Sequence, residues 1–188
     1  MAGSTVTESA TAEPSSGRRV MRIALVAVLA VAAIVGSWYW LTHPSSLEGS
    51  GADLELSSSI GHTLAIDTTV SSAGEGETAR VTLKDLTPRI VQNTADASVV
   101  LVVCHRNAGS NALGTGEVAE LSKYCTRVDP LRRMPDARLG FSTNQIVALV
   151  TARKAGVLHI AGFDAGYRVG LRRGRQHVGA DIRLTAAR

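Results

Sequence analysis

The apolar positions of this chain follow two patterns, and the first is one long run near the N-terminus. Residues 23–42 are twenty consecutive positions without a charged side chain, and they read IALVAVLAVAAIVGSWYWLT. At a rise of about 1.5 Å per residue, a helix of this length spans about 30 Å, the thickness of the hydrocarbon core of a bilayer. The pattern predicts one transmembrane α-helix, which we place over residues 20–42.

The residues at the two ends of the run predict its orientation in the cell membrane. Three arginines precede it, whereas His43, Pro44, two serines and Glu48 follow it before any Lys or Arg. Because positively charged flanks stay in the cytoplasm, we expect a cytoplasmic N-terminus and an extracytoplasmic C-terminal domain. An aromatic triplet at the far end suits the outer headgroup layer. The expected membrane-interface residues are Arg18, Arg19, Arg22, Trp38, Tyr39 and Trp40.

A cleaved signal peptide is the alternative reading of the same run. Signal peptides have an apolar core of about 7–15 residues, followed by a site of the type small-x-small. Here the core is longer, Val31-Ala32-Ala33 lies inside it, and the bulky aromatic triplet follows Val35-Gly36-Ser37 directly. A retained anchor is therefore the main prediction, and a secreted protein released by cleavage remains the alternative.

The polar stretches on either side of the run predict the domain organisation. Residues 1–19 are rich in Ser and Thr and hold no aromatic residue, which is typical of a disordered tail on the cytoplasmic side. Residues 43–52 contain Pro, Ser and Gly and are expected to be a linker. The extracytoplasmic domain is then residues 53–188.

The second apolar pattern, found throughout this domain, has a period of two. Leu64, Ile66 and Val70 alternate with polar residues, as in a strand with one buried face. About eight such short strands are expected, and no long helical pattern separates them, so the domain should be an antiparallel sandwich or barrel. The expected turns include residues 153–156, 164–166 and 174–179.

One predicted strand differs because both of its faces are apolar. In SVVLVVCH, residues 98–105, a face with Val100, Val102 and Cys104 needs a cover besides the sheet core. The connection over residues 106–126, with its helix-like stretch GEVAELSKY, is the expected cover.

Cys104 and Cys125 are the only cysteines of the chain. Outside the cytoplasm, two cysteines predict one disulfide, and this bridge would contribute about 3 kcal/mol by closing the connection. Their separation of 21 positions suits neither a redox C-x-x-C pair nor a zinc ligand pair.

The C-terminal stretch carries a family resemblance. Residues 155–186, AGVLHIAGFDAGYRVGLRRGRQHVGADIRLTA, resemble the last strands of immunoglobulin-like domains in single-pass envelope proteins of GC-rich bacteria. Asp164-Ala165-Gly166-Tyr167 is similar to the D-x-G-x-Y stretch of that fold, although it is one residue short and no Cys stands two positions after the Tyr. The resemblance implies an all-β, immunoglobulin-like antiparallel β-sandwich after one transmembrane helix, and it implies no activity.

No spacing in the sequence is typical of catalysis or of metal binding. The histidines are scattered and no hydrolase or nucleotide-binding motif is present, so we expect no enzyme activity, no cofactor and no metal. The alternative is a metal-dependent or hydrolytic envelope enzyme assembled in space from carboxylates and His62, His105, His159 and His177. Nucleic acid is not an expected partner, because the domain lies outside the cytoplasm and has few aromatic residues for base stacking.

The chain has a net charge of +4, but its acidic and basic residues are unevenly distributed along the sequence. Residues 43–126 hold five Lys or Arg against ten Asp or Glu, whereas residues 127–188 hold twelve against four. Basic residues of the second half are a candidate contact patch for anionic lipid, an anionic envelope polymer or an acidic partner, unless they pair with the acidic half. This patch comprises Arg132, Arg133, Arg172, Arg173 and Arg175.

Together these patterns predict a membrane-anchored extracytoplasmic domain with a non-catalytic binding or structural role in the cell envelope. The expected partners are the lipid bilayer and either another envelope protein or an anionic envelope polymer. The sequence leaves the oligomeric state open.

Overall fold

The computed structural model describes residues 16–42, 47–49, 51–72, 81–107, 109, 113–133, 137–139 and 143–188. The chain divides into two compact units, Met1–Trp40 and Leu41–Arg188, which are described separately. The predicted disordered tail falls mostly on residues 1–15, which lie outside the described residues.

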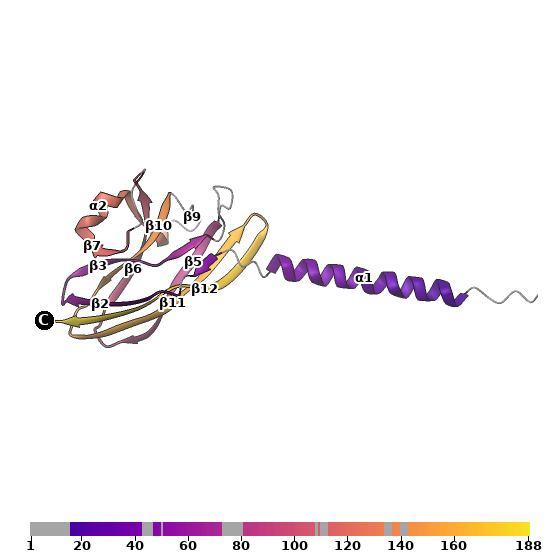
Figure 1. Cartoon of the computed structure of the whole chain (residues 1–188), viewed down its shortest axis with the longest axis horizontal. Helices are drawn as coiled ribbons and strands as arrows, with labels where there is room; N and C mark the ends of the chain where they lie inside the picture. The colour runs from indigo at the N-terminus through magenta and orange to yellow at the C-terminus, as the bar shows by residue number, and fades with distance from the viewer. Residues whose placement is uncertain are drawn as a thin grey trace, which may run out of the picture. The chain divides into compact units, whose positions relative to one another are not determined.

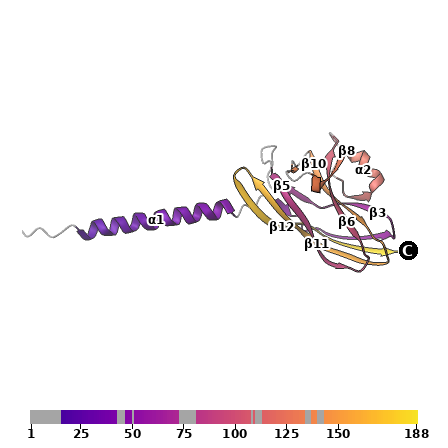
Figure 2. The ribbon, with the colours of Figure 1, turned by 180° about the vertical axis from the view of Figure 1, so that it is seen from behind.

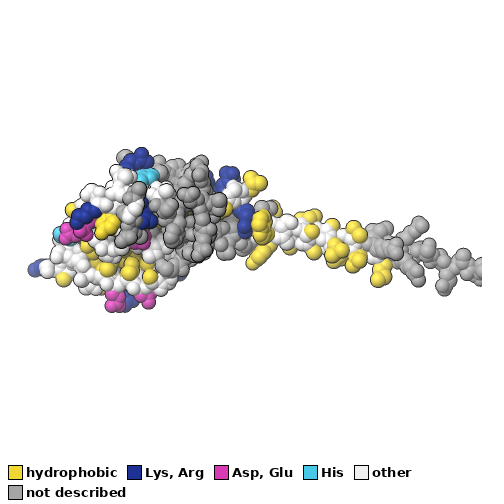
Figure 3. Space-filling model, turned by 45° about the horizontal axis from the view of Figure 1, so that its top comes forward, with side chains coloured by type: hydrophobic (Ala, Val, Ile, Leu, Met, Phe, Trp, Pro, Cys, Tyr) yellow, Lys and Arg dark blue, Asp and Glu magenta, His cyan; other side chains and the backbone are white. Residues whose placement is uncertain are grey.

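The first unit contains one helix, α1 (Ser16–Thr42), so the last residues assigned to the tail are helical. Its side chains are described at Met21 and from residue 24 to residue 40, and all of these are exposed. Hydrophobic side chains are distributed along this part of the helix (Figure 3). Among the described residues, no helix meets the length and apolarity needed to cross a membrane.

The second unit contains two five-stranded sheets and a two-stranded ribbon (Figure 1). In the order in which they pair, the first sheet consists of β7 (Thr115–Glu117), β3 (Thr63–Asp67), β10 (Asn144–Thr151), β6 (Ser98–Arg106) and β8 (Cys125–Pro130). The second sheet consists of β2 (Asp53–Ser59), β12 (Arg172–Ala187), β11 (Gly156–Val169), β5 (Val81–Asn93) and β9 (Ala137–Leu139). The ribbon pairs β1 (Leu47–Gly49) with β4 (Val70–Ser72). Three short helical segments complete the unit, namely η1 (Val118–Glu120), α2 (Leu121–Tyr124) and η2 (Leu131–Arg133).

The two sheets share one apolar core, because each turns a face toward the other. The first sheet contributes Ile66 and Ile146 to this core and the second contributes Phe163 and Ile182, all of them fully buried. All strand pairs are antiparallel except β2–β12, which is parallel. The expected all-β domain with a sandwich-like, mainly antiparallel arrangement is confirmed at this level.

The longest hairpin corrects two of the expected turns. Strands β11 and β12 pair from Gly156 opposite Ala186 to Val169 opposite Arg172, and Figure 2 shows the two strands running together to one tip. Residues 164–166 and 174–179, predicted to be turns, therefore lie inside strands, and the turn is at residues 170 and 171. The glycines misled the prediction because in a strand they also mark bulges and close approaches of backbone.

Part of the expected linker belongs to the domain. Residues 47–49 form β1, and the Leu47 side chain is buried in the shared core. The Gln176 side-chain amide donates a hydrogen bond to the Leu47 carbonyl oxygen (2.8 Å), and its oxygen accepts the hydroxyl of the buried Tyr167 (3.1 Å). Residues 43–46 and 50 lie outside the described residues.

Gly179, within strand β12, lies close to the backbone of Thr68 and to the ring of Phe163. Its φ is +92°, and a Cβ there would lie 2.7 Å from the Thr68 carbonyl oxygen and 2.8 Å from the Phe163 ring. We expect Gly179→Ala to lower the free energy of unfolding by about 1–3 kcal/mol, through strain at positive φ and through the contact itself. Urea denaturation measures the change. Gly51→Ala is the matched control, since a Cβ at Gly51 meets nothing within 4 Å; an equal effect of the two variants would contradict this account.

Candidate functional site

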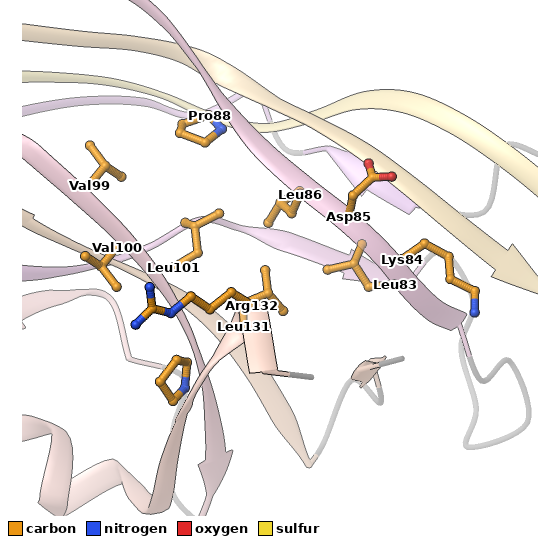
Figure 4. Close-up of a pocket in the computed structure, with 11 residues that line it drawn as sticks. Leu83, Lys84, Asp85, Leu86, Pro88, Val99, Val100, Leu101, Leu131 and Arg132 are labelled. Atoms are coloured by element: carbon orange, nitrogen blue, oxygen red, sulfur yellow. The ribbon is translucent and has the colours of Figure 1, made fainter. Parts of the chain in front are cut away.

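A groove lies between β5 of the second sheet and β6 of the first, at one open side of the domain. We call it the β5–β6 groove, and it has a volume of about 530 Å³. The end of β8 and η2 complete its wall (Figure 4). It is lined by Leu83, Lys84, Asp85, Leu86, Pro88, Val99, Val100, Leu101, Pro130, Leu131 and Arg132.

The groove exists because β9 and β8, the strands at the edges of the two sheets, pair with only part of β5 and β6. Strand β5 pairs with β9 at residues 81–83 only, and beyond this point its one strand partner among the described residues is β11. Strand β6 pairs with β8 at residues 102–106, so residues 98–101 pair only with β10 within the described part of the chain. Each strand therefore presents a stretch of sheet edge, whose backbone N–H and C=O groups are a template for a further strand.

The floor of the groove is apolar and partly open to water. Leu83 and Leu86 are buried, Leu101 and Leu131 are half-buried, and Val100 retains 49% of its surface exposed. In Figure 4 the four leucines point toward one another across the groove. Two more exposed apolar residues, Ile90 and Val91, follow on β5 beyond the groove. Apolar surface gathered beside free strand edges is typical of a protein-binding site.

The charge at this side of the domain is basic. Arg132 lines the groove and Arg89 is exposed on β5, and neither makes an ion pair among the described side chains. The one acid of the lining, Asp85, is directed elsewhere: its carboxylate accepts the Gly166 backbone N–H (3.0 Å) and lies 3.9 Å from the Arg175 guanidinium. Gly166 permits this approach, since a Cβ there would lie 2.6 Å from the carboxylate oxygens.

A second groove occupies the opposite open side, between β2 and β7, and we call it the β2–β7 groove. It has a volume of about 720 Å³. The exposed Glu117 and the partly exposed Glu120 lie on its rim. Asp53 and Glu55 are exposed along β2, in a separate hollow with Arg183. The ammonium of Lys123 lies 2.9 Å from the Glu120 carboxylate; this contact lowers the pKa of Glu120 and raises the pKa of Lys123. The groove is lined by Leu56, Ser57, Leu64, Thr115, Gly116, Glu117, Ala119, Glu120 and Lys123.

The expected disulfide is confirmed, and it fixes a cover over the outer face of the first sheet. Cys104 and Cys125 are bonded, and both are buried in a second apolar cluster with Val102, Leu113 and Leu121. The connection therefore covers one end of β6, as predicted. The prediction that it also covers Val100 is wrong, because that side chain lies beyond the cover and borders the β5–β6 groove.

Polar contacts hold the same connection on the sheet. The buried Gln145 side chain accepts the Leu113 backbone N–H (3.0 Å) and donates to the Leu113 carbonyl oxygen (2.7 Å). Nearby, burial raises the pKa of the Asp67 carboxyl, while hydrogen bonds from Gln145 and from the Thr69 N–H (3.0 Å) act in the opposite direction.

The five arginines of the expected basic patch lie on two adjoining surfaces. Arg132 lines the β5–β6 groove, and Arg133 follows it in η2, with a side chain outside the described part. Arg172, Arg173 and Arg175 begin β12, where Arg175 shares a polar hollow with Asp164 and His177. The expected membrane-interface residues all lie in α1; the side chains of Trp38, Tyr39 and Trp40 are exposed, and those of Arg18, Arg19 and Arg22 fall outside the described side chains.

Three of the four histidines considered for metal binding each contact a different aspartate. His105 contacts Asp129, His159 contacts Asp181, and His177 contacts Asp164, each at 2.9 Å. His62 is exposed in the turn after β2. Within the described part of the chain, no group of three or more His, Cys, Asp or Glu is placed to hold a metal ion.

The chain matches no protein-family model and no curated protein.

Sequence reasoning missed the β5–β6 groove, although two signals for it were present. The strand with two apolar faces carries more apolar residues than the disulfide-bonded connection can cover, and Val100 is the one left exposed. Ile90 and Val91 are adjacent apolar residues in a strand, so regular alternation would turn one of them away from the core. Neither signal reveals that the two strands border the same groove, because that depends on how the sheets pack.

The disulfide leads to a stability prediction. Replacing both cysteines by Ala should lower the free energy of unfolding by about 2–5 kcal/mol, because the unfolded chain gains the freedom of an open loop and the cover over Val102 loosens. Chemical denaturation of the full chain in detergent measures this change. The reduced wild-type chain is the control and should lose a similar amount. Unchanged stability in both would show that the bridge is not what holds the cover.

Proposed function

We propose that this chain is a single-pass membrane protein whose immunoglobulin-like domain lies outside the cytoplasm and binds an extended protein segment, without catalysis, in the β5–β6 groove. The observation that carries the proposal is the groove itself: an apolar floor between two strand edges that have no outer partner among the described residues. An extended segment can pair with such an edge through its backbone while alternate side chains enter the groove.

The strand order supports an immunoglobulin-like domain. If β2, β3, β5, β6, β10, β11 and β12 are lettered A to G in chain order, one sheet contains B-E-D and the other G-F-C. These are the neighbour orders of the immunoglobulin sandwich. The domain departs from that fold in two ways, because strand A joins G rather than B, and because the disulfide attaches a connection to strand D instead of joining B to F.

The membrane anchor is proposed from the sequence. The run without charge at residues 23–42 falls inside α1, whose described apolar side chains are all exposed. Arginines precede the run and the aromatic triplet ends it, which is the arrangement of a helix with a cytoplasmic N-terminus. The Cys104–Cys125 disulfide supports an oxidising compartment for the domain.

Membrane fractionation tests the anchor. We expect the chain to stay in the membrane pellet after alkaline extraction, and its intact mass to include Met21 to Trp40. As a matched pair, Val31→Arg near the centre of the run should release the chain from the membrane, whereas Ser16→Arg at the start of α1 should not, because a charge at the bilayer centre is costly and one at its edge is not. A mature chain that lacks these residues would establish cleavage and end the anchor proposal.

Site-specific photo-crosslinking in intact cells tests the groove. A photoreactive residue at Val100, on the groove wall, should give an adduct of one defined mass in the membrane fraction. The same residue at Leu171 is the matched control, since this side chain is 88% exposed at the tip of the β11–β12 hairpin and away from the groove. Mass spectrometry of the adduct identifies the captured segment. Adducts that are absent, or identical at the two positions, would rule out the groove as a binding site.

A further inference from the structure

The two open sides of the domain carry opposite charges on their grooves. The β5–β6 groove carries Arg132, and the β2–β7 groove carries Glu117. Arg89 is exposed on β5, and Asp53 and Glu55 are exposed on β2, where they line a separate hollow with Arg183. We propose that copies of this chain associate head to tail, with the β2–β7 side of one copy seated on the β5–β6 groove of the next. The inference rests on the proposed function, because it names the protein segment that the groove binds.

The two grooves lie at opposite edges of both sheets. In the second sheet β2 is at one end and β5 with β9 at the other; in the first sheet β7 is at one end and β6 with β8 at the other. A contact between unlike sides of two copies leaves one side of each copy unused. Such a heterologous contact extends into a row unless the rotation between copies closes a ring.

The opposite edges also match as strands. Strand β2 has no outer partner among the described residues, and β5 has none beyond β9. The two strands run in the same direction, because β2 is parallel to β12, and both β12 and β5 are antiparallel to β11. A copy related by translation therefore presents β2 to β5 as a parallel strand, which continues the second sheet from one copy to the next.

The side-chain pattern of β2 suits the groove that it would meet. Asp53 and Glu55 are exposed, whereas Leu54 and Leu56 alternate with them and are half-buried against the shared core. A strand of this pattern places its leucines on the face that carries the apolar groove and its carboxylates on the opposite face of the sheet.

Charge favours this contact over a symmetric one. In a symmetric dimer through the β5–β6 groove, Arg132 of one copy would face the basic side of its partner, and in a dimer through the β2–β7 groove the carboxylates would face one another. Like charges brought together at an interface disfavour the pairing, whereas unlike sides attract. If the chain is anchored as proposed, confinement to one membrane also raises the effective concentration of copies.

A charge swap tests the inference on the full chain in detergent. Sedimentation velocity over a range of concentrations should show the wild type associating beyond a dimer, less strongly as salt screens the charges. Glu117→Arg and Arg132→Glu should each raise the concentration of half-association by about tenfold or more. The double variant E117R/R132E should restore association. Glu117 is on β7, at one edge of the first sheet, and Arg132 follows β8, at the other edge. Rescue by the double variant therefore reports a contact between copies.

Arg173→Glu is the matched control, with the same charge change at an exposed position of the β11–β12 hairpin, and it should leave association unchanged. A wild type that stays monomeric, stops at a dimer, or is not rescued by the double variant would overturn the head-to-tail contact. The photo-crosslink at Val100 separates the two proposals. Capture of residues from β2 or β7 of another copy supports both. Capture of a different protein overturns self-association and keeps the proposed function, and no capture overturns both.

Discussion

The domain depends on a mismatch in length between its long strands and the short strands beside them. Strand β5 spans residues 81–93 and β9 covers three of them, while β6 begins four residues before its pairing with β8. Where a neighbouring strand ends, backbone groups lose their partners and side chains over the core lose their cover. Both losses occur at the same side of the domain, and together they make the β5–β6 groove.

A second constraint concerns the outer face of the first sheet. Strand β6 is apolar on both faces, so a two-sheet domain cannot bury it without a further layer. The connection between β6 and β8 supplies that layer through Leu113 and Leu121, and it is held by the disulfide and by the two hydrogen bonds of Gln145. The connection covers Val102 and Cys104 but not Val100. Val100 therefore remains exposed and borders the groove.

Several features of this domain were predictable because they depend on neighbours in the sequence. Alternation at Leu64 and Ile66 predicts a strand, the count and location of the cysteines predict a bridge, and the apolar excess of β6 predicts a cover; each is confirmed. The two misplaced turns have a common origin in glycine. Gly166 and Gly179 suggested turns, yet Gly166 makes room for the Asp85 carboxylate and Gly179 makes room for the Thr68 backbone. A close approach between distant segments requires glycine, as many turns do, so a glycine in the sequence does not distinguish the two.

The division of charge separates what the sequence determined from what the tertiary structure decided. Composition alone shows an acidic first half and a basic second half of the domain. It does not reveal that Arg132 lines a groove at one open side of the domain, or that Glu117 and Glu120 line a groove at the other. Strand periodicity and cysteine count act locally, so the sequence determined the strands, the bridge and the apolar run at the N-terminus. Grooves and charged sides arise where edges of two sheets meet, and only the order of strands in the folded domain decided which residues those edges bring together.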